Sequence, residues 1–424
     1  MSWSRMLNFV KELKQEYLRE HGSISYDYDS EIYKSVVEKW ASEVENTYYS
    51  ERIHFMYINQ LPNSNIYLFK YRGYTEIYSN FEPAEFWMID DGFYRYCRSI
   101  TIDVEEETVV MAAYDKFFNI NELPEVSEEE IAKKMASAQI IEITDKMDGS
   151  LQCARWYNNR LILSGSSALD RELSFRVDHG YRWLYENPSY IKMMQTFSNL
   201  SFIFEYIMDD DPHVVMYDYD LMRGLYLTGA RRMSDGTFLN YSELKKIADI
   251  FGVWITKQET MTFQEIMDSR DVFLCGEKEG WVVNIDGLRV KVKCDDFTNL
   301  HGLLSGYRKT GPRLGNAIVK AWVTDSIDDL LSRMPGDYRK EAEKVLERML
   351  EYLRDLDAYV AATCERMKQE CGNPDDVKTF MLYAQKNCPK DILGFVCNTY
   401  RGITNNYTKG FAWSDVVNRS RLPQ

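Results

Sequence analysis

The hydrophobic pattern of the chain changes near residue 301, and this change limits the fold more than any other feature. Apolar and polar residues alternate in "NIYLFKYRGYTEIYS" and "RSITIDVEEETVVMAAY", and strand-like runs continue to Cys294. Such alternation is typical of antiparallel strands with one buried face. Later segments such as "DYRKEAEKVLERMLEYLRDLDAYVAATCERMKQEC" carry apolar residues at helical spacing instead. The sequence therefore predicts an α+β chain, with a mainly antiparallel domain over residues 1–304 and an all-helical domain over residues 305–424.

Turn and cap signals place several elements within this outline. The pair Asn158-Asn159 and the pair Asp286-Gly287 each separate two strand-like runs, which predicts two hairpins. Ser127, with a glutamate three residues later, predicts the start of a helix and a capping box. We expect further helices at the N-terminus, over residues 172–197 and after residue 301, where "GNP" would end the longest one.

Charge and cysteine content narrow the class of protein. The net charge is −15, which argues against binding nucleic acid through bulk charge but allows one local basic groove. The eight cysteines are scattered, and no Cys-x-x-Cys occurs, which makes zinc and a disulfide framework improbable. No apolar run is long enough to span a bilayer. We expect an intracellular, cytoplasmic protein that binds no membrane.

The stretch "TDKMDGS" places Lys146 between an apolar run and a tight turn. A lysine amine can act as a nucleophile if nearby cations or burial lower its pKa. Taken alone, such a lysine is more often an exposed residue at a strand end. Its interpretation depends on the groups that the rest of the chain brings to it.

Four other charged residues lie in strand-like runs. Lys291 and Lys293, in "VKVK", would point the same way from one strand, so both could face a pocket, hold phosphate oxygens and lower the pKa of Lys146. Glu279 would begin the strand before them, and Glu205 lies in the apolar run "FIFEY", where a charge needs a partner. Each feature alone has an ordinary explanation: a solvated edge strand, a plain strand or a buried carboxylate with a hydrogen-bonding partner.

The order of these features is more specific than any one of them. Lys-x-Asp-Gly-Ser, Phe-Glu-Tyr, Glu-Gly-Trp-Val-Val and Val-Lys-Val-Lys form a series that resembles the covalent nucleotidyltransferase superfamily of ATP-dependent ligases and mRNA capping enzymes. Within it the chain is most similar to the phage-type RNA ligase 1 family, because "FKYRGY", "CRSITID" and "KFFN" match blocks that precede the nucleophile. "LHGLL", "CGNPDDVKTF" and "GFVCNTYRG" resemble the C-terminal helical domain of that family.

The resemblance implies an ATP-dependent RNA ligase that uses Mg²⁺ or Mn²⁺. Lys146 would attack the α-phosphate of ATP and carry AMP, which would pass to an RNA 5′-phosphate before a 3′-hydroxyl displaces it. The partners would be RNA with 5′-phosphate and 3′-hydroxyl ends, such as nicked tRNA, and a polynucleotide kinase-phosphatase that heals broken ends.

The resemblance also assigns roles to single residues. Lys291 and Lys293 would act with Lys146 in catalysis by holding phosphates. Glu279 would be catalytic and bind the metal or its water shell, and Glu205 would meet the ribose or a second metal. The other nucleotide-binding residues would be Asp148 and Gly149 at the turn near the ribose, Phe204 against adenine, Arg98 and Lys116 at the β,γ-phosphates or the RNA end, and Tyr71 and Phe118 as pocket lining.

Three positions depart from the family pattern. Gly165 stands in "LSGSSAL" where a lysine is expected, and Phe297 stands where an aromatic residue with a hydroxyl is usual. Asp145 would raise the pKa of Lys146, so we expect its side chain to point away. The alternatives are a DNA ligase or a GTP-using capping enzyme, which would need a small β-barrel after Lys293, and a nucleotide- or RNA-binding module without catalysis.

Overall fold

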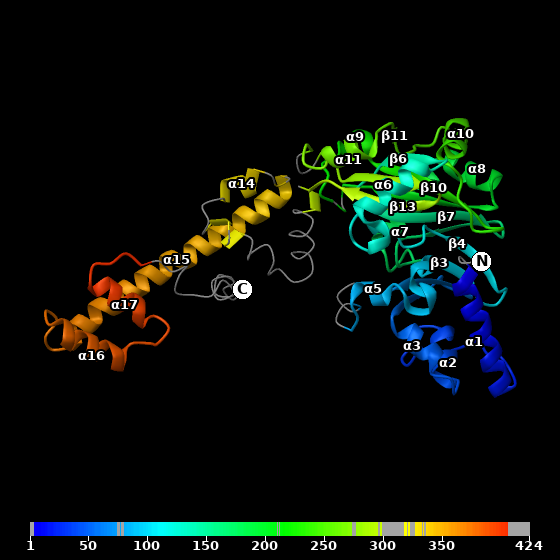
Figure 1. The fold of residues 1–424 in the computed structure, drawn as a ribbon. Coiled ribbons are helices and arrows are strands. Elements are labelled where there is room, and N and C mark those ends of the chain that lie inside the picture. Colours follow the sequence, from blue (N-terminus) through cyan, green and yellow to red (C-terminus); the bar gives the residue numbers. More distant parts are fainter. Residues whose placement is uncertain are drawn as a thin grey trace. The chain divides into compact units, whose positions relative to one another are not determined.

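The computed structural model describes residues 4–73, 77, 80–209, 211, 213–273, 277–295, 297–298, 318–319, 321–322, 327–332, 334 and 336–405 (Figure 1). It divides into two compact units, the first with the described residues up to Asp295 and the second with those from Phe297 onward. Antiparallel sheets fill the first unit and helices the second, so the predicted α+β composition is confirmed. The predicted domain boundary at residues 304 and 305 lies outside the described residues and stays a prediction.

Helices of the first unit lie before, between and after its strands. Short 3₁₀ turns at Ile89–Asp91, Phe93–Tyr96 and Pro124–Val126 join some of these elements. The helices are α1 (Arg5–His21), α2 (Val36–Glu43), α3 (Tyr48–His54), α5 (Pro83–Phe86), α6 (Glu128–Ser137), α7 (Phe175–Glu186), α8 (Pro188–Thr196), α9 (Tyr219–Met222), α10 (Tyr241–Phe251) and α11 (Phe263–Asp268). None of the described helices is both long and apolar enough to cross a membrane.

The strands of the first unit form sheets with the orders β1-β2-β3-β4, β10-β9-β7-β8 and β11-β6-β12-β13-β5. Every pairing is antiparallel except that of β13 with β5. The strands are β1 (Met56–Gln60), β2 (Ile66–Tyr71), β3 (Arg98–Asp103), β4 (Thr108–Ala112), β5 (Phe118–Asn119), β6 (Ile141–Asp145), β7 (Ser150–Tyr157), β8 (Arg160–Ser164), β9 (Leu200–Ile207), β10 (Gly224–Arg232), β11 (Gln258–Glu259), β12 (Gly280–Ile285) and β13 (Leu288–Lys293).

The sheet that contains β9 is buried on both faces. On one face Phe202 and Phe204 pack with Val177 of α7 and Leu244 of α10. On the other face Ile203 packs in a cluster that includes residues of β2 and β4. Because successive side chains of a strand point to opposite faces, β9 contributes to two cores at once. This double burial fixes the strand that carries Glu205.

The turn signals in the sequence are confirmed. Asn158 and Asn159 have positive φ angles of 46° and 59° and connect β7 to β8. Asp286 and Gly287, with φ angles of 48° and 95°, connect β12 to β13. Both pairs match the positive φ values that a two-residue hairpin loop requires. Ser127 caps α6 by accepting a hydrogen bond from the backbone N–H three residues later, but the reciprocal bond of a full capping box is absent from this described helix start.

Helices α14 (Ile327–Ser332), α15 (Gly336–Glu370), α16 (Val377–Asn387) and α17 (Leu393–Tyr400) belong to the second unit. Figure 1 shows α16 and α17 beside the C-terminal end of the long helix α15. The core between them includes Leu353, Val360, Phe380 and Val396. Helix α15 ends two residues before Gly372, whose φ of 79° fits the predicted stop. The segment "LHGLL" lies outside the described residues.

Candidate active site

A cavity of about 440 Å³ opens where the sheets of β9 and β13 meet the turn after β6. Its wall contains Lys146 and Gly149 from that turn, Glu205 from β9, and Lys291 and Lys293 from β13. Arg98, at the start of β3, also lines it. Six of the predicted residues, from four distant parts of the sequence, therefore share one cavity.

Glu279 joins two of the lysines. Its Oε2 lies 2.6 Å from Lys146 Nζ and its Oε1 lies 3.0 Å from Lys293 Nζ, and its side chain is 4% exposed. A backbone hydrogen bond also holds Lys146 beside the start of β12, because the Lys146 N–H donates to the carbonyl of Gly280 at 3.0 Å. A Cβ atom on Gly280 would lie 2.1 Å from the Val292 carbonyl oxygen, so glycine is needed for this close approach of backbones.

The turn after Lys146 is held against β9. The Gly149 N–H donates to Glu205 Oε1 at 3.2 Å. A Cβ atom at position 149 would lie 2.5 Å from the Tyr206 carbonyl oxygen and 2.8 Å from Ile207 Cδ1. The glycine of "KMDG" is therefore required by packing, and it brings Glu205 close to the lysine.

The pKa of Lys146 is raised, contrary to the prediction that nearby cations lower it. Burial lowers this pKa, but Glu279 and Glu205 raise it by more. Lys146 is therefore an ammonium group at neutral pH, and it would have to lose a proton before it could act as a nucleophile.

Glu205 is a carboxylate whose environment disfavours its charge. Burial, together with Glu279 and despite Lys146, raises the pKa of Glu205 to about 7. Among the described residues, no three His, Cys, Asp or Glu side chains form a group that could hold a metal ion. Glu205 and Glu279 fit a Mg²⁺ or Mn²⁺ that takes its other ligands from water and phosphate oxygens, which is how Mg²⁺ is commonly bound.

Three cations gather on the side of Phe117. Lys291 Nζ lies 4.7 Å and Arg98 Cζ 5.0 Å from the centroid of this ring. Burial and the positive charges of Arg98 and Lys116 lower the pKa of Lys291 well below its usual value. Burial also lowers the pKa of Lys116 to about 8, although Glu122 at 3.5 Å opposes this. Such mutual repulsion in a cavity favours an anionic ligand.

The predicted residues Tyr71, Lys116, Phe118 and Phe204 are not among the described residues that line this cavity. Phe204 is fully buried in the core on the opposite face of β9 from Glu205, so its predicted contact with adenine is wrong for this structure. Tyr71 is buried against Trp87, with ring centroids 4.9 Å apart, and is not among the described residues that line the cavity. Phe118 lines a neighbouring, smaller cavity together with Lys116.

A charged cluster at the wall of the cavity joins the predicted Asp148 to His213, Asp211 and Arg176, which the sequence analysis did not single out. The ring nitrogens of His213 lie 3.4 Å from Asp148 and 3.4 Å from Asp211, and Arg176 NH2 donates to Asp211 at 2.6 Å. Asp148 also accepts hydrogen bonds from the N–H groups of Val214 and of the following residue. Burial lowers the pKa of His213, but the two carboxylates raise it to about 9.

The departures from the family pattern have local explanations. Asp145 lies on the wall of the cavity, and its carboxylate pairs with Lys278 at 2.5 Å. A Cβ atom on Gly165 would lie 3.4 Å from Val177, an ordinary packing distance. Phe297 is fully buried.

The lysine and carboxylate centre on antiparallel sheets contains the groups that a covalent nucleotidyltransferase of the ligase class would need. Residues 96–297, slightly less than half of the chain, match the family described as RNA ligase. The matched region contains Lys146, Glu205, Glu279 and both β13 lysines, and it excludes the helices of the second unit.

Solved structures of an RNA ligase from Naegleria gruberi are also similar to this chain. The structure with PPi has a TM-score of 0.36 and 16% identity, and the match covers 44% of this chain and 57% of that one. A variant with ATP and Mn has a TM-score of 0.36 and 15% identity, and the match covers 46% and 59%. The matched part is less than two thirds of either ligase chain. No curated protein matches this chain.

Proposed function

We propose that the protein is an ATP-dependent RNA ligase that joins a 5′-phosphate to a 3′-hydroxyl through lysyl-AMP and an adenylylated RNA end. The observation that carries this proposal is the position of Lys146. Its amine lies 2.6 Å from Glu279, in a cavity whose wall also holds Lys291 and Lys293. A nucleophile, a proton acceptor and phosphate-binding cations are therefore within reach of one bound nucleotide.

The first step forms a bond between Lys146 Nζ and the α-phosphorus of ATP, and pyrophosphate leaves. Glu279 Oε2 is the acceptor in reach of the proton that Nζ must lose. Lys291 and Arg98 line this cavity and Lys116 lines the adjoining one. We assign all three to phosphate oxygens, on which negative charge builds as pyrophosphate departs. A Mg²⁺ or Mn²⁺ ion bound at Glu279 and Glu205 would neutralise phosphate charge.

In the second step an RNA 5′-phosphate oxygen attacks the same phosphorus and releases Lys146. In the third step the 3′-hydroxyl of the other strand attacks the RNA phosphorus, a phosphodiester forms and AMP leaves. Asp148 and Gly149 act here by holding the turn that presents Lys146 beside Glu205.

The helical content of the second unit favours an RNA ligase over a DNA ligase or a capping enzyme. A DNA ligase or a capping enzyme would need β-strands after Lys293, whereas the described residues beyond Phe297 contain helices and no strand. A binding module without catalysis has no use for a lysine that shares one carboxylate with a second lysine.

We further propose a role in repair of nicked tRNA in the cytoplasm, with a polynucleotide kinase-phosphatase preparing the ends. The helical unit, over α15 to α17, is the part of the chain that we assign to recognition of the RNA. Seven described cysteines are free thiols, which suits a reducing compartment.

Incubation with α-labelled ATP or GTP and magnesium, followed by denaturation, tests the covalent step. We expect label from ATP on the wild type and none on Lys146→Ala. Label from GTP alone would identify a capping enzyme, and no label from either would exclude the covalent mechanism.

The nucleic acid is tested separately. Single-stranded RNA and DNA with 5′-phosphate ends are offered to the adenylylated protein, and circular products are resolved on a gel. We expect RNA circles, whereas circles from DNA alone would overturn the substrate. Comparison of nicked tRNA with an unstructured RNA of equal length tests the repair role.

A further inference from the structure

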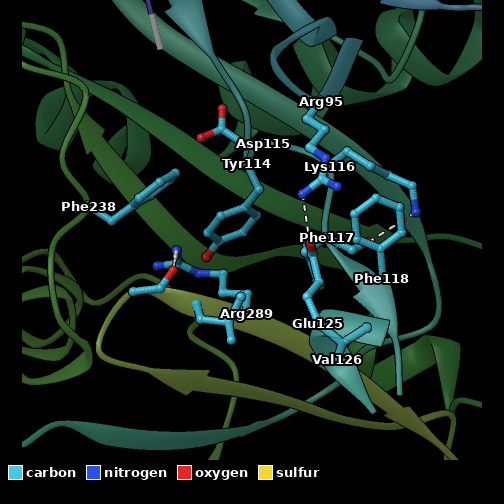
Figure 2. Close-up of a pocket in the computed structure, with 12 residues that line it drawn as sticks. Arg95, Tyr114, Asp115, Lys116, Phe117, Phe118, Glu125, Val126, Phe238 and Arg289 are labelled. Carbon is cyan, nitrogen blue, oxygen red and sulfur yellow. Dashed lines mark hydrogen bonds and ion pairs between the residues drawn. The ribbon is translucent and has the colours of Figure 1, made fainter. Parts of the chain in front are cut away.

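A second cavity, of about 150 Å³, adjoins the active-site cavity and shares Tyr114 and Phe117 with it. We call it the Arg289 pocket. Figure 2 shows Tyr114, Phe238 and Arg289 along one side of this pocket and Arg95 and Lys116 along the other. Cations and aromatic rings, the two groups that proteins use most to hold single-stranded nucleic acid, make up much of its wall. The wall also contains two carboxylates, Asp115 and Glu125, which are paired with Arg231 at 2.8 Å and with Arg95 at 2.7 Å.

Arg289 differs from the other two cations of the pocket. Arg95 pairs with Glu125 at 2.7 Å, and Lys116 pairs with Glu122 at 3.5 Å. Among the residues that the structure describes, no carboxylate forms an ion pair with Arg289. The half-buried guanidinium therefore keeps its charge available for an anion that enters the pocket.

The guanidinium is also held in place before any ligand binds. Its Cζ lies 4.7 Å from the ring centroid of Tyr114 and 4.2 Å from that of Phe238. Tyr114 is fixed in turn, because its hydroxyl donates to the Thr228 carbonyl at 2.5 Å and its ring fills the space that a Cβ on Gly229 would occupy. Stacking uses the flat face of an arginine and leaves its edge N–H groups to bind a phosphate.

Strand β13 connects the two cavities. Arg289, Lys291 and Lys293 alternate with the buried Val290 and Val292, so the three cations lie on one side of the strand. Residues two apart on a strand are about 6.6 to 6.8 Å apart, which suits consecutive phosphates of an extended nucleotide strand. Lys293 lies at Glu279 and Lys291 over Phe117, so the row of cations runs from the nucleophile into the Arg289 pocket.

We propose that the Arg289 pocket is a phosphate subsite for the donor strand, which holds the phosphodiester that follows the first nucleotide of the 5′-phosphorylated RNA. This inference rests on the proposed function. ATP and pyrophosphate offer the same chemistry, but Arg98, Lys291 and Lys293 already supply three cations on the wall of the cavity that contains Lys146. Arg289 lies two residues before Lys291 on β13, further from Lys293 and Glu279. An RNA chain would continue to this position, whereas a bound triphosphate would already have ended.

The experiment compares two chemically adenylylated donors with blocked 3′-ends, a mononucleotide (AppN) and a dinucleotide (AppNpN), each sealed to an acceptor RNA. We expect the wild type to prefer AppNpN. Arg289→Gln should lose about tenfold in kcat/KM for AppNpN, the order expected for one charge-assisted hydrogen bond, and should leave AppN unchanged. Arg289→Lys should lie between them, and the exposed Arg160→Gln should match the wild type.

Salt dependence adds a readout that a purely structural role would not change. In Arg289→Gln the slope of log kcat/KM for AppNpN against log salt should become shallower by about 0.7, the value for one phosphate of a single strand. Equal losses on both donors, or none, would overturn the subsite. A raised KM for ATP in self-adenylylation would assign the pocket to the triphosphate instead. If the wild type forms no lysyl-AMP and seals neither donor, the proposed function fails first, and this inference fails with it.

Discussion

Lys146 and Glu279 form an ion pair of 2.6 Å in which the carboxylate raises the pKa of the amine. The same carboxylate binds Lys293 at 3.0 Å through its other oxygen. Glu279 therefore keeps the proposed nucleophile protonated and in position until a nucleotide arrives. Replacing one carboxylate oxygen of Glu279 by an amide nitrogen tests its effect on the Lys146 proton without removing the side chain.

Glu279→Gln should lower the pKa of Lys146 and still slow adenylylation. The pKa falls because the amide no longer stabilises the ammonium, while the rate falls by about 100-fold or more because the proton acceptor is lost. The pKa is measured from the pH dependence of Lys146 modification by an amine reagent, read by mass spectrometry.

The matched control for this variant is Glu259→Gln, because Glu259 pairs with Lys278 at 3.2 Å. It should leave both the pKa of Lys146 and the rate of adenylylation unchanged. An unchanged Lys146 pKa in Glu279→Gln would contradict the role of the ion pair.

Gly149→Ala should destabilise the protein and reduce adenylylation. Its Cβ would lie 2.5 Å from the Tyr206 carbonyl oxygen, so either β9 or the turn with Lys146 must move. Overpacking of this kind costs about 1–3 kcal/mol. Thermal unfolding and label transfer from ATP measure the two effects.

Gly165→Ala is the matched control, because it makes the same glycine-to-alanine change without a steric clash. Its Cβ would meet Val177 at an ordinary 3.4 Å. We expect it to keep wild-type stability and activity. If Gly149→Ala behaved in the same way, the turn would not be held by the packing described above.

Much of the framework could be predicted from sequence because it rests on local rules. The hairpins at Asn158 and Asp286 follow from the positive φ values that short loops require, and the lysines of β13 share a side because strands have a period of two. The prediction that Phe204 contacts adenine is wrong because it ignores this period of two. Since Glu205 faces the cavity, its immediate neighbour on the strand must face the other way.

The remaining features depend on distances between segments far apart in the chain. His213 lies in a loop without periodicity, and nothing in the sequence indicates that it bridges Asp148 and Asp211. The sign of the Lys146 pKa shift depends on Glu279 being nearer than the cations. Strand alternation places such groups in one cavity, but it does not give their separations.

Glu205→Gln should make the protein more stable at alkaline pH. The folded-state pKa of Glu205 is about 7 against an ordinary value of 4.5, so its ionisation costs stability as pH rises between these values. Below pH 4.5 the carboxyl is neutral in both states and the variant gains nothing. Above pH 7 the gain should approach about 3 kcal/mol, since folding raises the pKa by about 2.5 and each pKa unit corresponds to about 1.4 kcal/mol.

Urea unfolding of both proteins from pH 4.5 to pH 8.5 measures this difference. A gain that does not grow with pH would show that Glu205 is not held against its charge. The expected pattern is that of a functional carboxylate kept at a cost in stability.

His213→Asn should remove a pH-dependent part of the stability. The folded-state pKa of His213 is about 9, above its ordinary 6.5, because Asp148 and Asp211 favour the imidazolium. Its contribution is therefore complete below pH 6.5 and is lost as pH rises through 9. At pH 6 the variant should be less stable by about 1–3 kcal/mol, and the difference from the wild type should shrink towards pH 9.5. Urea titrations at these pH values test this, with the exposed, unrelated His54→Asn as control. A difference independent of pH would mean that His213 contributes by packing and not by its charge.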